Sequence, residues 1–193
     1  ASVMGISNAY FSNTFLLAWT TGSLGIERQL MLNILLGMAI LQFIWQPIAA
    51  KIAERFGIAR VMLAGLILSV VLTVPYFLAI QAASPLWITV TLYATIIGST
   101  AYYALLATLL ASAFPARIRY SGVSLAYQLC ATVFGGSTPL VAQWILNSTG
   151  GSVWGVAVFY AVMILITIAG VWGLQRRIAR SVETETAAAA SVV

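Results

Sequence analysis

Two long stretches without any charged side chain constrain the fold of this chain most strongly. No Asp, Glu, Lys or Arg occurs from Val61 to Ala116, and none occurs from Tyr120 to Gln175. Only 7% of the 193 residues are charged and 62% are hydrophobic, whereas soluble domains carry roughly 25% charged residues. A water-soluble fold could not cover its surface with so few charges. The sequence therefore predicts an integral membrane protein whose surroundings are a lipid bilayer.

Helices are the elements that fit these stretches. A bilayer core about 30 Å thick needs roughly 20 apolar residues as helix, an open sheet cannot cross lipid, and the runs lack the alternation of barrel strands. We therefore expect an all-α membrane protein with six transmembrane helices in one domain, residues 1–175, and a disordered cytoplasmic tail, residues 176–193, which is polar and of low complexity. The expected spans are residues 4–22, 30–50, 60–83, 86–113, 120–147 and 153–175.

The basic residues predict the orientation. Eight of the nine Lys and Arg residues lie in the second link, in the fourth link or after the last span, and only Arg28 lies on the other side. Since basic links remain in the cytoplasm, we expect both termini to be cytoplasmic and the protein to be multi-pass in the inner (plasma) membrane. Their distribution over short links also argues against nucleic-acid binding. The eight residues are Lys51, Arg55, Arg60, Arg117, Arg119, Arg176, Arg177 and Arg180.

Side chains that carry enzymatic chemistry are absent from the expected spans. The sequence has no His and a single cysteine, Cys130, so it offers no disulfide or metal framework. Catalysis inside a membrane normally needs an intramembrane ionisable or metal-ligating group. We therefore expect no enzymatic activity, no metal and no cofactor. All four acidic residues lie in links or in the tail: Glu27, Glu54, Glu183 and Glu185.

Polar and aromatic side chains at helical spacing mark a candidate substrate cavity. Thr91, Thr95, Ser99 and Tyr102 follow steps of 4, 4 and 3, which places them on one helix face, with Tyr103 beside it. Such groups are costly in hydrocarbon, so these faces should meet other helices or water. Alternatively, Ser and Thr side chains bond carbonyls of their own helix or pack against a neighbour. The candidate cavity residues are Asn8, Ser12, Gln42, Ser99, Tyr102, Tyr127 and Gln128.

Two further features carry two interpretations each. Gly135-Gly136 with Pro139 interrupts the fifth span, either as a kink, which we favour, or as a hinge of a moving helix. In the second link, positive charge around Gly57 either sets the topology alone or belongs to a tight turn whose charges stabilise one conformation of a transporter. The candidate loop residues of both cytoplasmic links are Glu54, Arg55, Gly57, Arg60, Arg117 and Arg119.

The two cytoplasmic links also carry a family resemblance. Ala50-Lys-Ile-Ala-Glu-Arg-Phe-Gly-Ile-Ala-Arg60 is similar to the Gly-x-x-x-Asp-Arg-x-Gly-Arg-Arg loop signature of the major facilitator superfamily. Phe114-Pro-Ala-Arg-Ile-Arg-Tyr-Ser-Gly-Val-Ser-Leu-Ala-Tyr-Gln128, followed by Phe134-Gly-Gly and Pro139, resembles the metabolite:proton symporter family within it. Phe43-Ile-Trp-Gln-Pro-Ile48 looks most like the citrate-type members.

The resemblance implies that the chain is the C-terminal six-helix half of a secondary transporter, built from two inverted three-helix repeats. It implies a small organic acid or zwitterion as substrate, with relatives that carry shikimate, α-ketoglutarate, citrate, proline or betaine. It also implies H⁺ as coupling ion, alternating access, and an N-terminal six-helix half as partner. The missing initiator Met fits a fragment or a processed product.

Departures from the family signature keep other interpretations open. The first signature has Ala50 where Gly is usual, Glu54 for Asp, and Ile58-Ala59 where bases are usual. Because no span contains an acid, a proton-carrying carboxylate would come from the N-terminal half, or the coupling is not to protons. One alternative is a degenerate, non-transporting six-span protein or assembly partner. Another is a homodimeric carrier that completes its own cavity.

Overall fold

The computed structural model describes the backbone of residues 1–190 and the side chains of residues 1–178. Every regular element in this part of the chain is a helix. Two short π-helical segments, η1 and η2, continue the helices on either side of them, so residues 3–22 and 119–148 each form one continuous helical segment. The elements are α1 (Val3–Tyr10), η1 (Phe11–Leu16), α2 (Leu17–Gly22), α3 (Arg28–Phe56), α4 (Ile58–Gln81), α5 (Pro85–Ser112), α6 (Arg119–Cys130), η2 (Ala131–Gly135), α7 (Gly136–Ser148) and α8 (Val153–Ala190).

The all-helical class expected from the sequence is confirmed, and five helical segments are long and apolar enough to cross a bilayer. The first segment, residues 3–22, is not among these five. Its polar side chains include Asn8, Ser12 and Asn13. The five segments are Arg28–Phe56, Ile58–Gln81, Pro85–Ser112, Arg119–Ser148 and Val153–Ile178.

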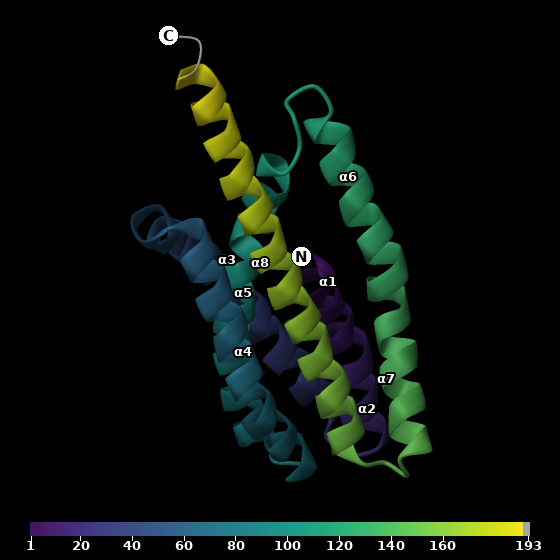
Figure 1. Ribbon diagram of the computed structural model, residues 1–193. Helices are drawn as coiled ribbons and strands as arrows, with labels where there is room; N and C mark the ends of the chain where they lie inside the picture. The colour runs from purple at the N-terminus through teal and green to yellow at the C-terminus, as the bar shows by residue number, and fades with distance from the viewer. Residues whose placement is uncertain (191–193) are drawn as a thin grey trace.

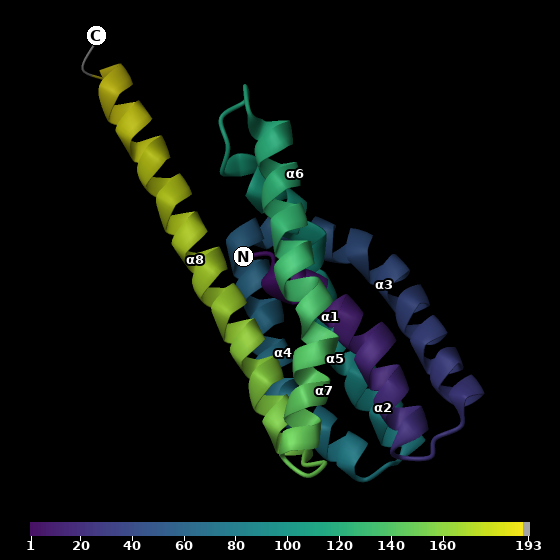
Figure 2. The ribbon, with the colours of Figure 1, turned by 90° about the vertical axis from the view of Figure 1, so that its right-hand side faces the viewer.

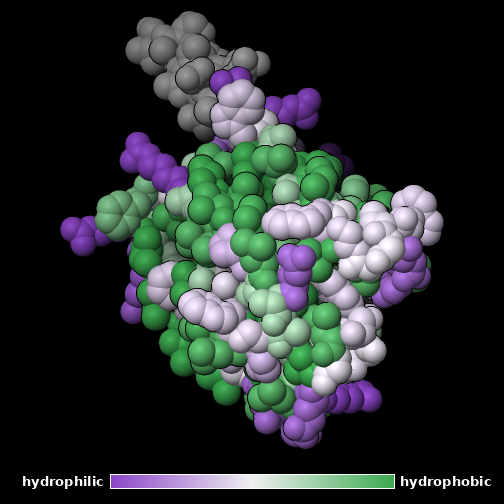
Figure 3. All heavy atoms as spheres, turned by 90° about the horizontal axis from the view of Figure 1, so that it is seen from below, coloured by the Kyte–Doolittle hydropathy of each residue, from purple (hydrophilic) through white to green (hydrophobic). Residues whose placement is uncertain are grey.

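Successive long segments run in opposite directions through the molecule (Figures 1 and 2). The link at Gly57 and the link at 113–118 lie toward the end at which α8 terminates, and the links at 23–27, 82–84 and 149–152 lie at the opposite end. The basic links thus share one end of the molecule. Seen from the other end, hydrophobic residues cover much of the surface, residues of intermediate hydropathy lie toward the right, and most strongly hydrophilic residues lie at the margins (Figure 3).

Small residues allow a close contact between α4 and α5. A Cβ atom added at Gly65 would lie 2.4 Å from the carbonyl oxygen of Gly98, and one at Gly98 would lie 2.6 Å from that of Gly65. The two backbones therefore touch, as small residues permit between membrane helices. Next to this contact α3 packs on α5, where Trp45 donates from Nε1 to the carbonyl of Ile97 at 2.9 Å.

Aromatic rings form the centre of the core. The ring of Phe11 in η1 lies 4.9 Å from that of Tyr160 in α8, measured between centroids, and 6.1 Å from that of Phe77 in α4. Tyr76 also packs into this group and is fully buried. Such contacts fix the first segment against α4 and α8, which places its polar face toward α3 and α5.

The fifth span is distorted where the sequence places Gly135, Gly136 and Pro139. The distortion is the π-turn η2, and Pro139 lies inside the helix that follows. Proline cannot donate a backbone hydrogen bond, so the Gly135 carbonyl, four residues before it, lacks its usual helical donor. The hydroxyls of Ser137 and Thr138 donate to the carbonyls of Val133 and Phe134. A break at this point is present, whereas its use as a hinge stays a prediction.

The C-terminal segment differs from the expected disordered tail. α8 continues past the last span to Ala190, so the backbone of residues 176–190 is helical, and residues 191–193 lie outside the described residues. The physical reason is local composition. After Gly173 the chain contains no glycine or proline up to Ala190, and it is rich in Ala, Glu and Arg, which favour helix.

Candidate functional site

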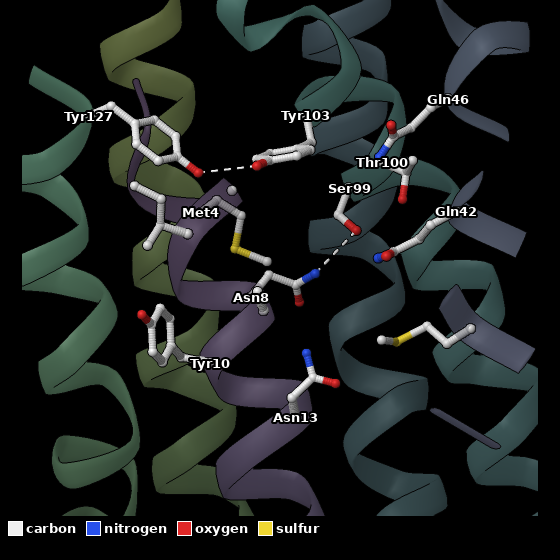
Figure 4. Close-up of a pocket in the computed structure, with 14 residues that line it drawn as sticks. Met4, Asn8, Tyr10, Asn13, Gln42, Gln46, Ser99, Thr100, Tyr103 and Tyr127 are labelled. Carbon is white, nitrogen blue, oxygen red and sulfur yellow. Dashed lines mark hydrogen bonds between the residues drawn. The ribbon is translucent and has the colours of Figure 1, made fainter. Parts of the chain in front are cut away.

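A polar cavity of about 290 Å³ lies between the first segment, α3, α5 and α6 (Figure 4). None of the side chains that line it, all within the described part of the chain, carries a formal charge. Amides, hydroxyls and phenols alternate there with thioethers and small apolar groups. The lining residues are Met4, Gly5, Ile6, Asn8, Ala9, Tyr10, Asn13, Met38, Gln42, Gln46, Ser99, Thr100, Tyr103 and Tyr127.

Four of the seven residues predicted for the cavity from the sequence line it. Gln42 lies on α3 between Met38 and Gln46, and all three line the cavity, as their spacing of four predicts. Both glutamines are half-buried, so their amides face the cavity rather than lipid. The four residues are Asn8, Gln42, Ser99 and Tyr127.

Asn8 is the most buried amide of the site. Its Oδ1 accepts a hydrogen bond of 2.8 Å from the hydroxyl of Tyr160, and its Nδ2 donates to Ser99 Oγ at 3.5 Å. It is 9% exposed, and that remaining exposure faces the cavity. Asn8 thus joins the first segment to α5 and α8 while contributing to the cavity wall.

Two tyrosines close one side of the cavity. The hydroxyls of Tyr103 on α5 and Tyr127 on α6 lie 3.1 Å apart and share a hydrogen bond, as Figure 4 shows. Only one of the two protons is used in that bond, so the pair keeps a donor for another group. The contact joins α6 to α5 across the cavity and depends on those two side chains.

The π-turn η1 explains why Ser12 does not line the cavity. At α-helical spacing Ser12 follows Asn8 by four residues on the same face. A π-turn closes with hydrogen bonds five residues apart, which delays the return to that face by one position. Ser12 is accordingly buried at 1% exposure, and Asn13 lines the cavity beside Asn8. The sequence contains no signal for this turn, so Asn13 was missed.

Tyr102 and Gln128 lie close to the cavity in sequence but do not line it. Tyr102 is fully buried, and its hydroxyl donates to the carbonyl of Ala1. Its neighbour Tyr103 takes the cavity position on α5. Gln128 is exposed on the outer side of α6, one residue past Tyr127. Adjacent helical residues point about 100° apart, which separates both pairs.

Thr91 and Thr95 of the α5 stripe follow the alternative interpretation, in which such hydroxyls bond carbonyls of their own helix. Thr95 Oγ1 donates to the carbonyl of Thr91 at 2.8 Å, and Thr91 Oγ1 donates to that of Trp87 at 2.7 Å. Both hydroxyls thus bond carbonyls of their own helix. Of the four stripe residues, Ser99 alone lines the cavity.

The candidate loop residues lie at the ends of helices. Gly57 has φ of 95°, a left-handed conformation that favours glycine, and it joins α3 directly to α4. The guanidinium of Arg55 lies 5.7 Å from the centroid of the Phe56 ring. In the other link Arg119 Nε donates to the carbonyl of Phe114 at 3.3 Å. Three further side chains are exposed: Glu54, Arg60 and Arg117.

The sequence is similar to that of several bacterial transporters. It is 30% identical to the shikimate transporter of Escherichia coli over 161 residues, which is 82% of this chain and 36% of that protein. It is 31% identical to an ectoine/proline transporter of Corynebacterium glutamicum over 125 residues, 65% of this chain and 24% of that protein. A citrate-proton symporter of Klebsiella pneumoniae is 32% identical over 116 residues, 58% of this chain and 26% of that protein.

The chain's relatives are transporters of the major facilitator type. The resemblance expected from the two cytoplasmic links is thereby confirmed. This chain spans well under half of the length of the major facilitator relatives that it matches. No family model matches the sequence. No solved structure matches it either.

Proposed function

We propose that this chain is the C-terminal half of a secondary transporter, which moves a small organic acid or zwitterion across the inner membrane by alternating access coupled to protons. The observation that carries the proposal is an uncharged polar cavity wall built from four helical segments, in a chain homologous to metabolite transporters. An N-terminal half of six further helices would face this wall and complete the substrate route.

The first segment, residues 3–22, would also cross the membrane and bring the number of spans from five to six. At 1.5 Å per residue, residues 3–22 reach about 30 Å, the thickness of a bilayer core. Its polar face carries Asn8 and Asn13, which line the cavity, while Phe11 and Phe15 are buried in the core. Polar residues are tolerated in a membrane helix that lines such a cavity. Six spans would then form two inverted repeats of three helices.

The chemistry of the wall suits transient binding. Neutral amides and hydroxyls bind carboxylate and hydroxyl oxygens without holding a full countercharge, so a substrate can be released again. Tyr10 and Met38 offer apolar contact for a carbon skeleton. The proposed coupling to protons draws on the name of one relative, a citrate-proton symporter. Because Glu27 and Glu54 lie at the ends of α3, the N-terminal half would supply the proton-carrying carboxylate.

Uptake measurements test the proposed function. The chain would be expressed alone and joined to its natural upstream sequence, and the uptake of citrate, α-ketoglutarate, shikimate and betaine would be measured in cells or liposomes with and without a pH gradient. We expect gradient-dependent uptake of at least one substrate by the joined form only. Replacement of Gln42 by Leu should weaken it, because an amide donor and acceptor leave the wall.

Each other result of this experiment points to a different function. Uptake by the chain alone would contradict the half-transporter proposal and support a homodimeric carrier that completes its own cavity. If neither form transports any of the four substrates although both are folded and inserted in the membrane, the symporter proposal is wrong. A degenerate or assembly-only protein would then account for the chain.

A further inference from the structure

A chain of hydrogen bonds with a fixed direction passes through Asn8. The hydroxyl of Tyr160 donates to Asn8 Oδ1 at 2.8 Å, Asn8 Nδ2 donates to Ser99 Oγ at 3.5 Å, and Ser99 Oγ donates to the carbonyl of Ile96 at 3.3 Å. It connects α8 with the first segment and α5. Tyr160 and Ser99 are both buried, at 4% exposure each.

The last bond in this series, from Ser99 to the backbone carbonyl of Ile96, determines which way the Asn8 amide points. A carbonyl oxygen can only accept, so the proton of Ser99 is used on Ile96 and the Ser99 oxygen is left to accept from Asn8. The amide nitrogen of Asn8 must therefore face Ser99, and its oxygen must face the Tyr160 hydroxyl. The Ser99 bond selects this orientation, and the Tyr160 hydroxyl, which can donate or accept, adds a second bond that holds it.

This orientation leaves one donor of Asn8 at the cavity. An amide nitrogen carries two protons, and Ser99 is the one acceptor that Nδ2 meets among the described residues. Asn8 lines the cavity, and Figure 4 shows its nitrogen on the side of Ser99 and Gln42. A buried donor without an acceptor is costly, so this position favours a ligand oxygen.

We propose that Asn8 donates this hydrogen bond to a carboxylate or carbonyl oxygen of the transported substrate, and that Tyr160 is the positioning residue that holds the amide in the donating orientation. The proposal rests on the proposed function for its ligand. Tyr160 itself does not line the cavity and acts through Asn8. Without the Tyr160 hydroxyl, Asn8 keeps only the 3.5 Å bond to Ser99, so its amide is held less firmly in the donating orientation.

Tyr76 provides a matched control within the same aromatic group. Its ring centroid lies 6.5 Å from that of Tyr160, and both side chains are buried. The hydroxyl of Tyr76, however, has no hydrogen-bond partner in the described structure. Replacing either tyrosine by phenylalanine removes one buried hydroxyl from the same cluster, but only Tyr160→Phe removes a bond to Asn8.

The experiment measures substrate KM and Vmax for the full-length transporter, using whichever of the four substrates it takes up. Tyr160→Phe should raise KM about fivefold, the equivalent of roughly one hydrogen bond, and leave Vmax near its original value. Tyr76→Phe should leave both unchanged. Once Asn8 is replaced by Ala, Tyr160→Phe should have no further effect on KM, because its action passes through the amide.

Two results would overturn the proposal: equal changes in KM for Tyr160→Phe and Tyr76→Phe, or an effect of Tyr160→Phe that persists in full in the Asn8→Ala background. Failure of the proposed function looks different, since the unaltered protein would then transport none of the substrates. In that event the thermal unfolding temperatures of Tyr160→Phe, Tyr76→Phe, Asn8→Ala and the Tyr160→Phe, Asn8→Ala double variant test the contact between Tyr160 and Asn8. Non-additive unfolding temperatures for Tyr160→Phe and Asn8→Ala support the positioning contact, and additive ones contradict it.

Discussion

At the scale of single residues, neighbours in the sequence take opposite roles in this protein. Ser12 is buried in the core while Asn13 lines the cavity, and Tyr102 is buried while Tyr103 lines the cavity. A hydrophobicity pattern identifies a polar stripe, but not which of its edges meets the cavity. The α5 stripe of Thr91, Thr95, Ser99 and Tyr102 follows steps of 4, 4 and 3, and a step of four drifts about 40° on an α-helix, so only Ser99 of the four reaches the cavity.

Replacing Asn13 tests this residue-level assignment. We expect Asn13→Leu to raise the KM for substrate about fivefold, because one hydrogen-bonding amide leaves the wall. Ser12→Ala serves as the control and should leave KM unchanged, since Ser12 faces the core. Kinetic uptake measurements on the full-length transporter would compare the two. A larger effect at Ser12 than at Asn13 would mean that η1 is absent in the working protein.

At the scale of elements, the positions of the helices were predictable and the two π-turns were not. Helices form along the long apolar runs, but α3 continues to Phe56, beyond the expected 30–50, and Gly57 then joins it to α4. η2 forms where Gly135, Gly136 and Pro139 already indicated a break, whereas no residue pattern marked η1. The contact of α4 with α5 is likewise set by tertiary structure, because glycine at two distant positions does not by itself indicate a backbone contact.

The α4–α5 contact makes a prediction about stability. Gly98→Val should lower the free energy of unfolding by about 1–3 kcal/mol, because the new side chain meets the Gly65 carbonyl and Ser69. Gly173→Ala is the matched control in α8, where an added Cβ meets nothing within 4 Å, and it should be neutral or slightly stabilising. Thermal unfolding of the purified proteins in detergent measures both. Equal unfolding temperatures for the two variants would refute the close contact.

At the scale of the whole molecule, composition was sufficient to predict a helical membrane protein, and the basic links predicted its up-and-down path. The structure gathers those links at one end of the molecule (Figure 1). The extended helix at residues 176–190 was not predicted, because low complexity and polarity were weighed above the helix propensity of Ala and Glu.

Reporter fusions test the proposed orientation. A reporter that is active only outside the cytoplasm should be active after Ala83 and inactive after Ile118, because the second position follows the basic link at Arg117. A reporter that is active only in the cytoplasm should give the reverse pattern at the same two sites. If both reporters are active at the opposite sites, the orientation is inverted, and the proposed cytoplasmic location of both termini is wrong.

Cysteine labelling at two adjacent positions of α3 tests the central claim, that one polar face of this chain lines a water-filled substrate route. In the full-length transporter with Cys130 replaced by Ala, Gln42→Cys should react with a hydrophilic, membrane-impermeant thiol reagent, and substrate should slow that reaction. Phe43→Cys, on the lipid-facing side of the same helix, should react slowly and without substrate protection. Equal reaction at both positions, or protection at Phe43→Cys alone, would contradict the account.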